Sequence, residues 1–154
     1  MNKLGALLGV GFAALVGAFV WQATRPETNE TGSMVHPDED ATKGLAQGAA
    51  IVQIDLPQEL SEAAKIGQRI FEVKCAVCHG ENAVGQNGVA PPLVHRTYEP
   101  SHHSDIAFQL AVQNGVRAHH WRFGNMPPID GLTRADVQSI VAYVRELQRA
   151  NGIY

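Results

Sequence analysis

The clearest periodic pattern of apolar positions lies near the C-terminal end of the chain. Thr133 and Asp136 have the spacing of a helix capping box, and Asn151 with the following glycine is a common helix end signal. Between these signals, apolar residues recur on one helical stripe: Val137, Ile140, Val141, Val144 and Leu147. The pattern predicts an amphipathic helix between Thr133 and Asn151.

Two further helices are predicted upstream of this one. Ser61 begins a helix that carries Gly67 and Phe71 on one stripe and a set of apolar residues on a neighbouring stripe. That set is Ile66, Ile70, Val73 and Val77. Another helix begins near Ser104 and ends at Asn114, which a glycine follows.

The rest of the C-terminal part reads as loop, and no segment alternates apolar and polar residues as a strand does. Residues 80–100 contain three glycines and three prolines, which suits a loop. The fold class is therefore predicted to be all-α. Three helices with long loops in about 95 residues make a thin apolar core, so something other than side chains is expected to fill the middle.

The N-terminal segment is apolar over a length that matches a membrane. Leu4–Trp21 contains 18 residues without a charge, and at ~1.5 Å per residue a helix of that length spans about 27 Å. Trp21 stands where a signal-peptide cleavage site has a small residue, so an uncleaved transmembrane anchor over residues 1–23 is favoured over a removed signal peptide. Either segment exports the remainder of the chain.

Residues 24–59 are predicted to be an acidic, flexible linker before a folded domain over residues 60–154. From Gln22 to Glu59 the chain has seven acidic residues against two basic ones, together with three prolines. A short apolar piece, Ala49–Leu56, is alternatively expected to lie against the domain. The net charge of −3 over 154 residues, without a lysine or arginine cluster, argues against nucleic acid as a partner.

The two cysteines carry the strongest chemical signal. They lie in Cys75-Ala76-Val77-Cys78-His79, the C-x-x-C-H spacing of c-type haem attachment. Two thiols at this spacing can form thioethers with one haem, and the adjacent histidine then projects toward the iron. The alternatives are a thioredoxin-like dithiol, a lone disulfide and half of a zinc site.

A second axial ligand must come from elsewhere in the domain. Met126 is the one methionine of residues 60–154 and lies between Gly124-Asn125 and two prolines, whose rigid backbone suits a fixed ligand. His119 and His120 are the rival ligands, which would give bis-histidine coordination. With both axial positions of the iron filled, electron transfer rather than enzymatic chemistry is expected.

Together these residues resemble the class I, mitochondrial-type cytochrome c family, in a membrane-anchored bacterial form. The resemblance covers roughly residues 61–149 and rests on the helix before CAVCH, the APPL run at residues 90–93, the GNMPP run at 124–128, and a final helix carrying Tyr143. It implies helices and loops wrapped around one covalent haem c. It also implies that Gly67, Phe71 and Tyr143 pack the first helix on the last, and that Pro91 offers its carbonyl to His79 Nδ1.

The function expected from these features is that of a single-electron carrier between membrane redox complexes. The N-terminal helix would hold it, as a single-pass protein, to a bacterial inner membrane, with the haem domain in the periplasm and redox proteins as donor and acceptor. The alternative within the same fold is a haem c subunit of an oxidase, reductase or dehydrogenase complex.

Several polar residues outside these motifs are candidates for a second metal site or for contacts with the haem propionates. Two histidine pairs could form a second metal site if the loops brought them together, which would suit a copper-handling or copper-sensing module. These pairs are His102-His103 and His119-His120. The candidates to hold the haem propionates are His95, Arg96, Tyr98, Trp121 and Arg122.

Overall fold

The computed structural model describes residues 41–154. The predicted anchor over residues 1–23 and the first part of the predicted linker, residues 24–40, lie outside the described residues. Among residues 41–154, no helix is long and apolar enough to cross a membrane.

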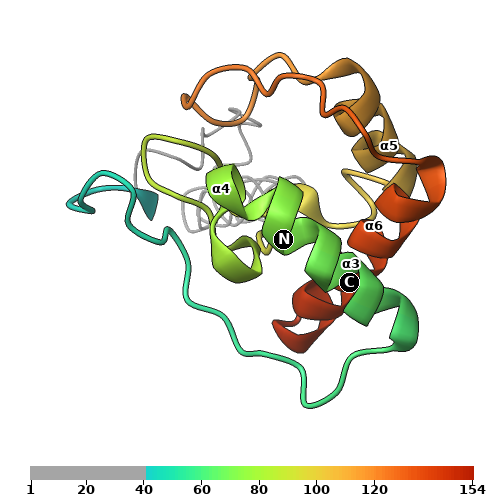
Figure 1. The fold of residues 1–154 in the computed structure, drawn as a ribbon. Coiled ribbons are helices and arrows are strands. Elements are labelled where there is room, and N and C mark those ends of the chain that lie inside the picture. The colour runs from blue at the N-terminus through green and yellow to red at the C-terminus, as the bar shows by residue number, and fades with distance from the viewer. Residues whose placement is uncertain (1–40) are drawn as a thin grey trace, which may run out of the picture. The chain divides into compact units, whose positions relative to one another are not determined.

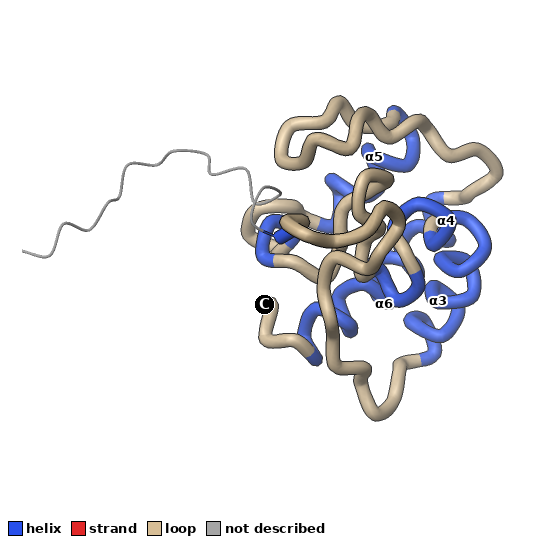
Figure 2. The backbone as a smooth tube through the Cα atoms, turned by 90° about the vertical axis from the view of Figure 1, so that its left-hand side faces the viewer, coloured by secondary structure: helices blue, strands red, loops and turns tan. Residues whose placement is uncertain are grey.

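Helices and loops make up the described part of the chain, in agreement with the all-α prediction. The helices are α3 (Glu62–Lys74), α4 (Ala76–His79), α5 (Asp105–Asn114) and α6 (Arg134–Ala150), with 3-10 turns at Glu81–Ala83 and Arg96–Tyr98 (Figure 1). Residues 41–154 contain no strand, and the long connections between the helices are loops (Figure 2).

The three predicted helices are confirmed, and so are the signals that start and end them. The Ser61 hydroxyl accepts a hydrogen bond from Ala64 N and caps α3. Thr133 and Asp136 form the complete capping box of α6, with each side chain bonded to the backbone of the other residue. Gly115 ends α5 with a φ of 72°, a left-handed conformation that glycine adopts without a steric penalty.

The core forms where α3 crosses α6 (Figure 1). A Cβ at Gly67 would lie 1.9 Å from the carbonyl oxygen of Ser139, so only glycine lets the two backbones approach this closely. One turn further along α3, the rings of Phe71 and Tyr143 meet edge to face at a centroid distance of 5.7 Å. The packing that the resemblance implies for Gly67, Phe71 and Tyr143 is thereby confirmed.

The buried face of α3 differs from the more prominent apolar stripe in its sequence. Its buried residues are Ala64, Gly67 and Phe71, whereas Val73 is 76% exposed and Val77, in α4, is 73% exposed. The close backbone approach to α6 at Gly67 buries the stripe that contains this glycine, which turns these two valines away from the helix pair.

The second half of the predicted linker is bound to the domain. The amides of Ile51 and Val52 both donate to the carbonyl of Val84, and Asn87 N donates to Ala49 O. Further along, Asp55 N donates to the Asn151 side chain just after α6, which in turn donates to Asp55 O. The alternative that Ala49–Leu56 lies against the domain therefore describes this segment, because its backbone groups find partners in the loop after α4 and at the end of α6.

Candidate functional site

The C-x-x-C-H motif occupies the junction of α3 and α4. Cys75 is at once the last cap of α3 and the first cap of α4, and its amide donates to Phe71 O. Cys78 and His79 lie in the single turn of α4 that follows. The rigid packing of α3 on α6 therefore fixes the position of the first thiol, and one helical turn fixes the second.

The surroundings of the two thiols argue against the alternatives to haem attachment, which are a thioredoxin-like dithiol, a lone disulfide and half of a zinc site. Both are free cysteines, with Cys78 exposed and Cys75 partly buried. Burial, aided by the neighbouring Cys78, raises the pKa of the Cys75 thiol to about 11. Among residues 41–154 the cysteines belong to no group of three or more zinc-ligating side chains, and no strand precedes them as in thioredoxin-like proteins.

His79 is held with one ring nitrogen engaged. Its Nδ1 lies 2.9 Å from the carbonyl oxygen of Pro91, the contact that the resemblance implies. A carbonyl can only accept, so Nδ1 carries the proton and Nε2 is left with a lone pair. Burial lowers the pKa of His79, with the Pro91 contact acting in the opposite direction, so the imidazole is neutral at pH 7.

The loop after α4 is packed tightly enough to hold Pro91 in place. Gly85 N donates to His79 O at 2.7 Å, and the Gln86 side chain donates to the carbonyls of Ala76 and Val77. A Cβ at Gly85 would lie 2.5 Å from the backbone nitrogen of Pro92. His79, Pro91 and Pro92 thus lie in one tightly packed segment, residues 79–92.

Met126 lies in the loop between α5 and α6, with its backbone paired to Val116. Met126 N donates to Val116 O at 3.0 Å and Val116 N donates to Met126 O at 2.9 Å. A Cβ at Gly115 would lie 2.5 Å from Met126 O, so this glycine permits the close pairing. Although the loop is long, the backbone at Met126 is therefore defined, and its side chain is half-buried.

A buried indole adds an independent observation on the cofactor. Trp121 is 5% exposed, and its Nε1 makes no hydrogen bond within the described residues. The Tyr98 hydroxyl lies near without reaching hydrogen-bond geometry; burial raises the Tyr98 pKa and the indole partly offsets this. A buried donor without a partner fits a bound acidic group such as a haem propionate, for which both residues are predicted donors.

His95, another predicted propionate residue, lies against this indole. The His95 ring meets Trp121 edge to face at a centroid distance of 5.4 Å, and burial lowers the His95 pKa. His95 Nδ1 lies against Thr97, within the 3-10 turn. The side chains of Arg96 and Arg122 are exposed.

A buried arginine on α6 organises the loop between Leu93 and Asp105, and the sequence pattern does not single it out. Arg145 donates to the carbonyls of Tyr98 and His103 and to the carboxylate of Asp105. Its neighbour Gln148 donates to Leu93 O and also to Tyr98 O. The one available signal is that Arg145 falls next to the apolar stripe of the last helix rather than opposite it.

The two histidine pairs are brought together by this loop and the one that contains Met126. His102 Nε2 lies 3.2 Å from His120 Nε2, and the His103 and His119 rings are stacked at a centroid distance of 6.0 Å. Burial lowers the pKa of His103. His119 and His120, the rival ligands for the iron, therefore contact His102 and His103.

Comparison with known proteins identifies the domain. The family model described as Cytochrome c matches residues 64–148, which is more than half of the chain. No curated protein matches the sequence. The matched region includes the C-x-x-C-H motif, so the cofactor is one haem c attached covalently through Cys75 and Cys78. The free thiols, the neutral His79 and the Trp121 indole, which makes no hydrogen bond within residues 41–154, all fit this group, and the chain belongs to the cytochrome c family.

Proposed function

We propose that this cytochrome c shuttles single electrons between larger redox complexes at the outer face of a bacterial inner membrane. Haem-based electron transfer follows from the family. When bound, haem c supplies a one-electron couple between ferric and ferrous iron.

The orientation of His79 is the observation that carries the proposal. The contact between its Nδ1 and Pro91 O leaves Nε2 as the nitrogen with which His79 would bind iron as the proximal ligand. The histidine follows Cys78 directly, so the thioethers and the proximal ligand come from one helical turn. A carbonyl acceptor on Nδ1 also makes the imidazole a stronger donor toward a metal.

Met126 would be the second residue of the chain to bind the iron. Its paired backbone and the following prolines would hold its sulfur with little conformational freedom, whereas His119 and His120 contact a different histidine pair. A neutral thioether favours ferrous over ferric iron and raises the reduction potential. If His79 and Met126 both bind the iron, they would exclude a substrate from it, which suits an electron carrier.

The membrane part of the proposal rests on the sequence of residues 1–23. The uncharged run from Leu4 to Trp21 would anchor the domain, and the acidic stretch up to the segment bound at Ala49–Leu56 would let it move between partners. The alternatives are a removed signal peptide, which gives a soluble periplasmic carrier, and a haem c subunit bound permanently in a larger complex.

Isolation of the full chain from its native membranes tests these alternatives. We expect the haem protein to stay in the membrane pellet at alkaline pH, to have an intact mass that includes residues 1–23, and to separate from other proteins in mild detergent. The purified reduced form should then be oxidised rapidly when it is returned to the membranes. A mature N-terminus beyond Trp21 would contradict the anchor, and stable co-purification with an oxidase or dehydrogenase would contradict the shuttle.

A further inference from the structure

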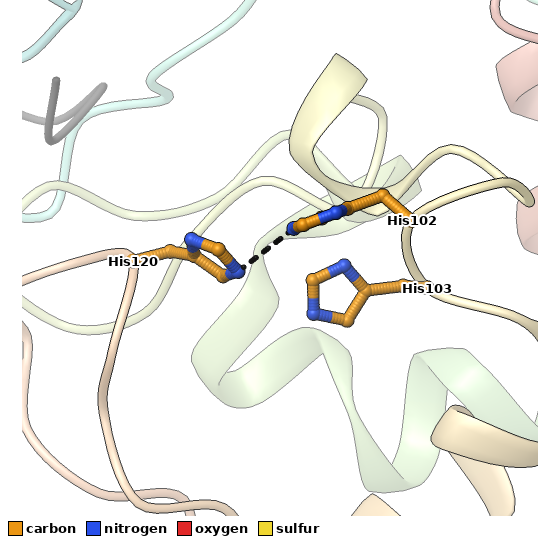
Figure 3. Close-up of side chains that lie close together, drawn as sticks. All are labelled: His102, His103 and His120. Carbon is orange, nitrogen blue, oxygen red and sulfur yellow. Dashed lines mark hydrogen bonds between the residues drawn. The ribbon is translucent and has the colours of Figure 1, made fainter. Parts of the chain in front are cut away.

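Four histidines from two separate loops form one cluster on the cytochrome c domain. His102 and His103 follow the 3-10 turn at Arg96–Tyr98, and His119 and His120 follow α5 in the chain. Potential ligand atoms of His102, His103 and His120 all lie within 4.8 Å of one another (Figure 3). The fourth ring, His119, lies 4.3 Å from His120 between centroids.

One pair of nitrogens in the cluster already has the spacing of two ligands on one metal ion. His102 Nε2 and His120 Nε2 are 3.2 Å apart, and two imidazole nitrogens on one tetrahedral Zn²⁺ at 2.0–2.1 Å would be about 3.4 Å apart. A neutral imidazole has one lone-pair nitrogen, so a cluster of three or four can offer that many ligands to a single ion. The His102 and His120 nitrogens could therefore share an ion where they stand, and rotation of the His103 ring, whose ligand atom lies within 4.8 Å of both, would add a third ligand.

Two of the rings have the outer contacts that orient histidine ligands. His103 Nδ1 lies 2.6 Å from Thr97 O, and His119 Nδ1 lies 2.9 Å from Arg117 O. Each carbonyl can only accept, so each ring donates from Nδ1 and keeps Nε2 for another partner. Donation of the second ring N–H to a backbone carbonyl is the usual arrangement around histidines that bind metals.

The loop that carries His102 and His103 is also hydrogen-bonded to α6. Arg145, 7% exposed on α6, donates to the carbonyl of Tyr98, before this loop, and to the carbonyl of His103 itself. Gln148, also buried, donates a second hydrogen bond to Tyr98 O. One half of the cluster is thus held by buried side chains of α6, which reduces the entropic cost of closing it around an ion.

We propose that His102, His103 and His120, with His119 beside them, bind one divalent transition-metal ion, and that Cu²⁺ is the ion bound most tightly. An all-imidazole ligand set suits copper, nickel and zinc, and affinities for such sites peak at Cu²⁺ among these ions. The site uses none of the residues assigned to haem c, so it stands independently of the proposed electron shuttle. It would give this cytochrome a second metal centre, built from the loops before and after α5.

Titration of the full-length, haem-loaded, oxidised protein with Cu²⁺ in competition with a chelator tests the proposal. We expect one ion per chain with a dissociation constant below about 10 μM, and a copper electron paramagnetic resonance signal split by several imidazole nitrogens. The double variant His102→Ala/His120→Ala should bind at least about 100-fold more weakly, since loss of outer contacts alone costs about 10- to 100-fold.

The control variant His36→Gln removes a histidine from outside the described cluster and should keep the wild-type affinity. An unchanged haem absorption spectrum reports whether each variant is folded, and the nitrogen splitting in the wild type tests the ligand set without any substitution. Binding without nitrogen splitting, binding no tighter than the stated limit, or equal affinities of the wild type and the double variant would each overturn the proposal.

Discussion

At the scale of single residues, the site depends on which atoms are left free by their neighbours. His79 Nε2 is free because Nδ1 faces Pro91 O at 2.9 Å, and the Cys75 thiol is protonated in the absence of the cofactor because burial raises its pKa to about 11. The Trp121 Nε1 is buried without a hydrogen bond in residues 41–154. These are local properties, and each would suit one contact with haem c in the proposed site.

The double variant Cys75→Ala/Cys78→Ala tests the covalent attachment. Both thioethers are removed, while His79 and its contact with Pro91 stay in place. We therefore expect that any haem retained by this variant is extracted fully by acidic organic solvent, whereas haem in the wild type remains with the polypeptide.

The single variant Cys78→Ala is the control, because one thioether through Cys75 should still keep the haem with the chain. Haem that resists extraction in the double variant would show that the attachment lies elsewhere.

Residue spacing predicted the haem attachment motif, Cys75 to His79, because the attachment chemistry uses residues that are close together in the chain. The proximity of Pro91 to His79 came only from the resemblance, since no local rule links residues 12 positions apart across a loop. The role of Arg145 was not predicted at all, because its partners Tyr98, His103 and Asp105 are brought to it by tertiary folding.

At the scale of elements, the contact of α3 with α6 determines where the first cysteine lies. The capping residues and the apolar stripe of the last helix predicted these elements well, because capping and amphipathic spacing are local. The buried face of α3 was harder to predict, since it depends on how closely the partner helix approaches at Gly67. The exposed Val73 and Val77 show that the most apolar stripe is not always the buried one.

The variant Gly67→Ala tests the close approach of α3 and α6. An alanine would gain up to about 1 kcal/mol of helix propensity, but its Cβ would lie 1.9 Å from Ser139 O, a backbone atom that can yield only if the helices separate. We expect a net loss of about 1–3 kcal/mol in the free energy of unfolding, measured by denaturant titration of the haem-loaded protein.

Gln68→Ala, the next position of α3, serves as control and should change the stability by less than about 0.5 kcal/mol. Equal stabilities of Gly67→Ala and Gln68→Ala would contradict the close helix contact.

The variant Arg145→Met tests the attachment of the 93–105 loop to α6. The methionine keeps most of the buried volume but leaves the His103 carbonyl without its donor and removes the charge over the Phe108 ring. We expect the free energy of unfolding to fall by about 2–3 kcal/mol, as for buried polar groups that lose their partner. Denaturant titration is again the measurement.

Arg149→Met is the matched control on the same helix. Arg149 is exposed and lies 3.9 Å from Glu146, so its removal should cost less than about 1 kcal/mol. If both variants lost the same stability, the loop would not depend on Arg145.

At the scale of the whole molecule, the chain combines a cofactor domain with an N-terminal segment of different composition. Net charge over 154 residues is −3, yet residues 60–154 carry one more basic than acidic residue, so the acidity belongs to the segment before the domain. Part of that segment, including Ile51 and Asp55, is hydrogen-bonded to the domain. Composition could not predict this docking, because it depends on carbonyl and amide groups of distant loops.

The small size of the folded part is explained by its cofactor. Within residues 41–154, four helices and long loops bury a short set of apolar side chains around Phe71, Tyr143 and Leu147. A covalent haem adds a large apolar body to such a core, which a chain of this length would otherwise lack. Whether the cofactor only carries electrons depends on whether the chain fills both axial positions of the iron.

The absorption spectrum of the oxidised, full-length protein tests that point most directly. With His79 and Met126 as ligands, the spectrum should contain the weak band at the red end of the visible range that sulfur-ligated ferric haem produces. The band should disappear in Met126→Ala and persist in the control Met34→Leu. A wild-type protein without this band, or a Met126→Ala variant that retains it, would show that His79 and Met126 are not the two residues that bind the iron.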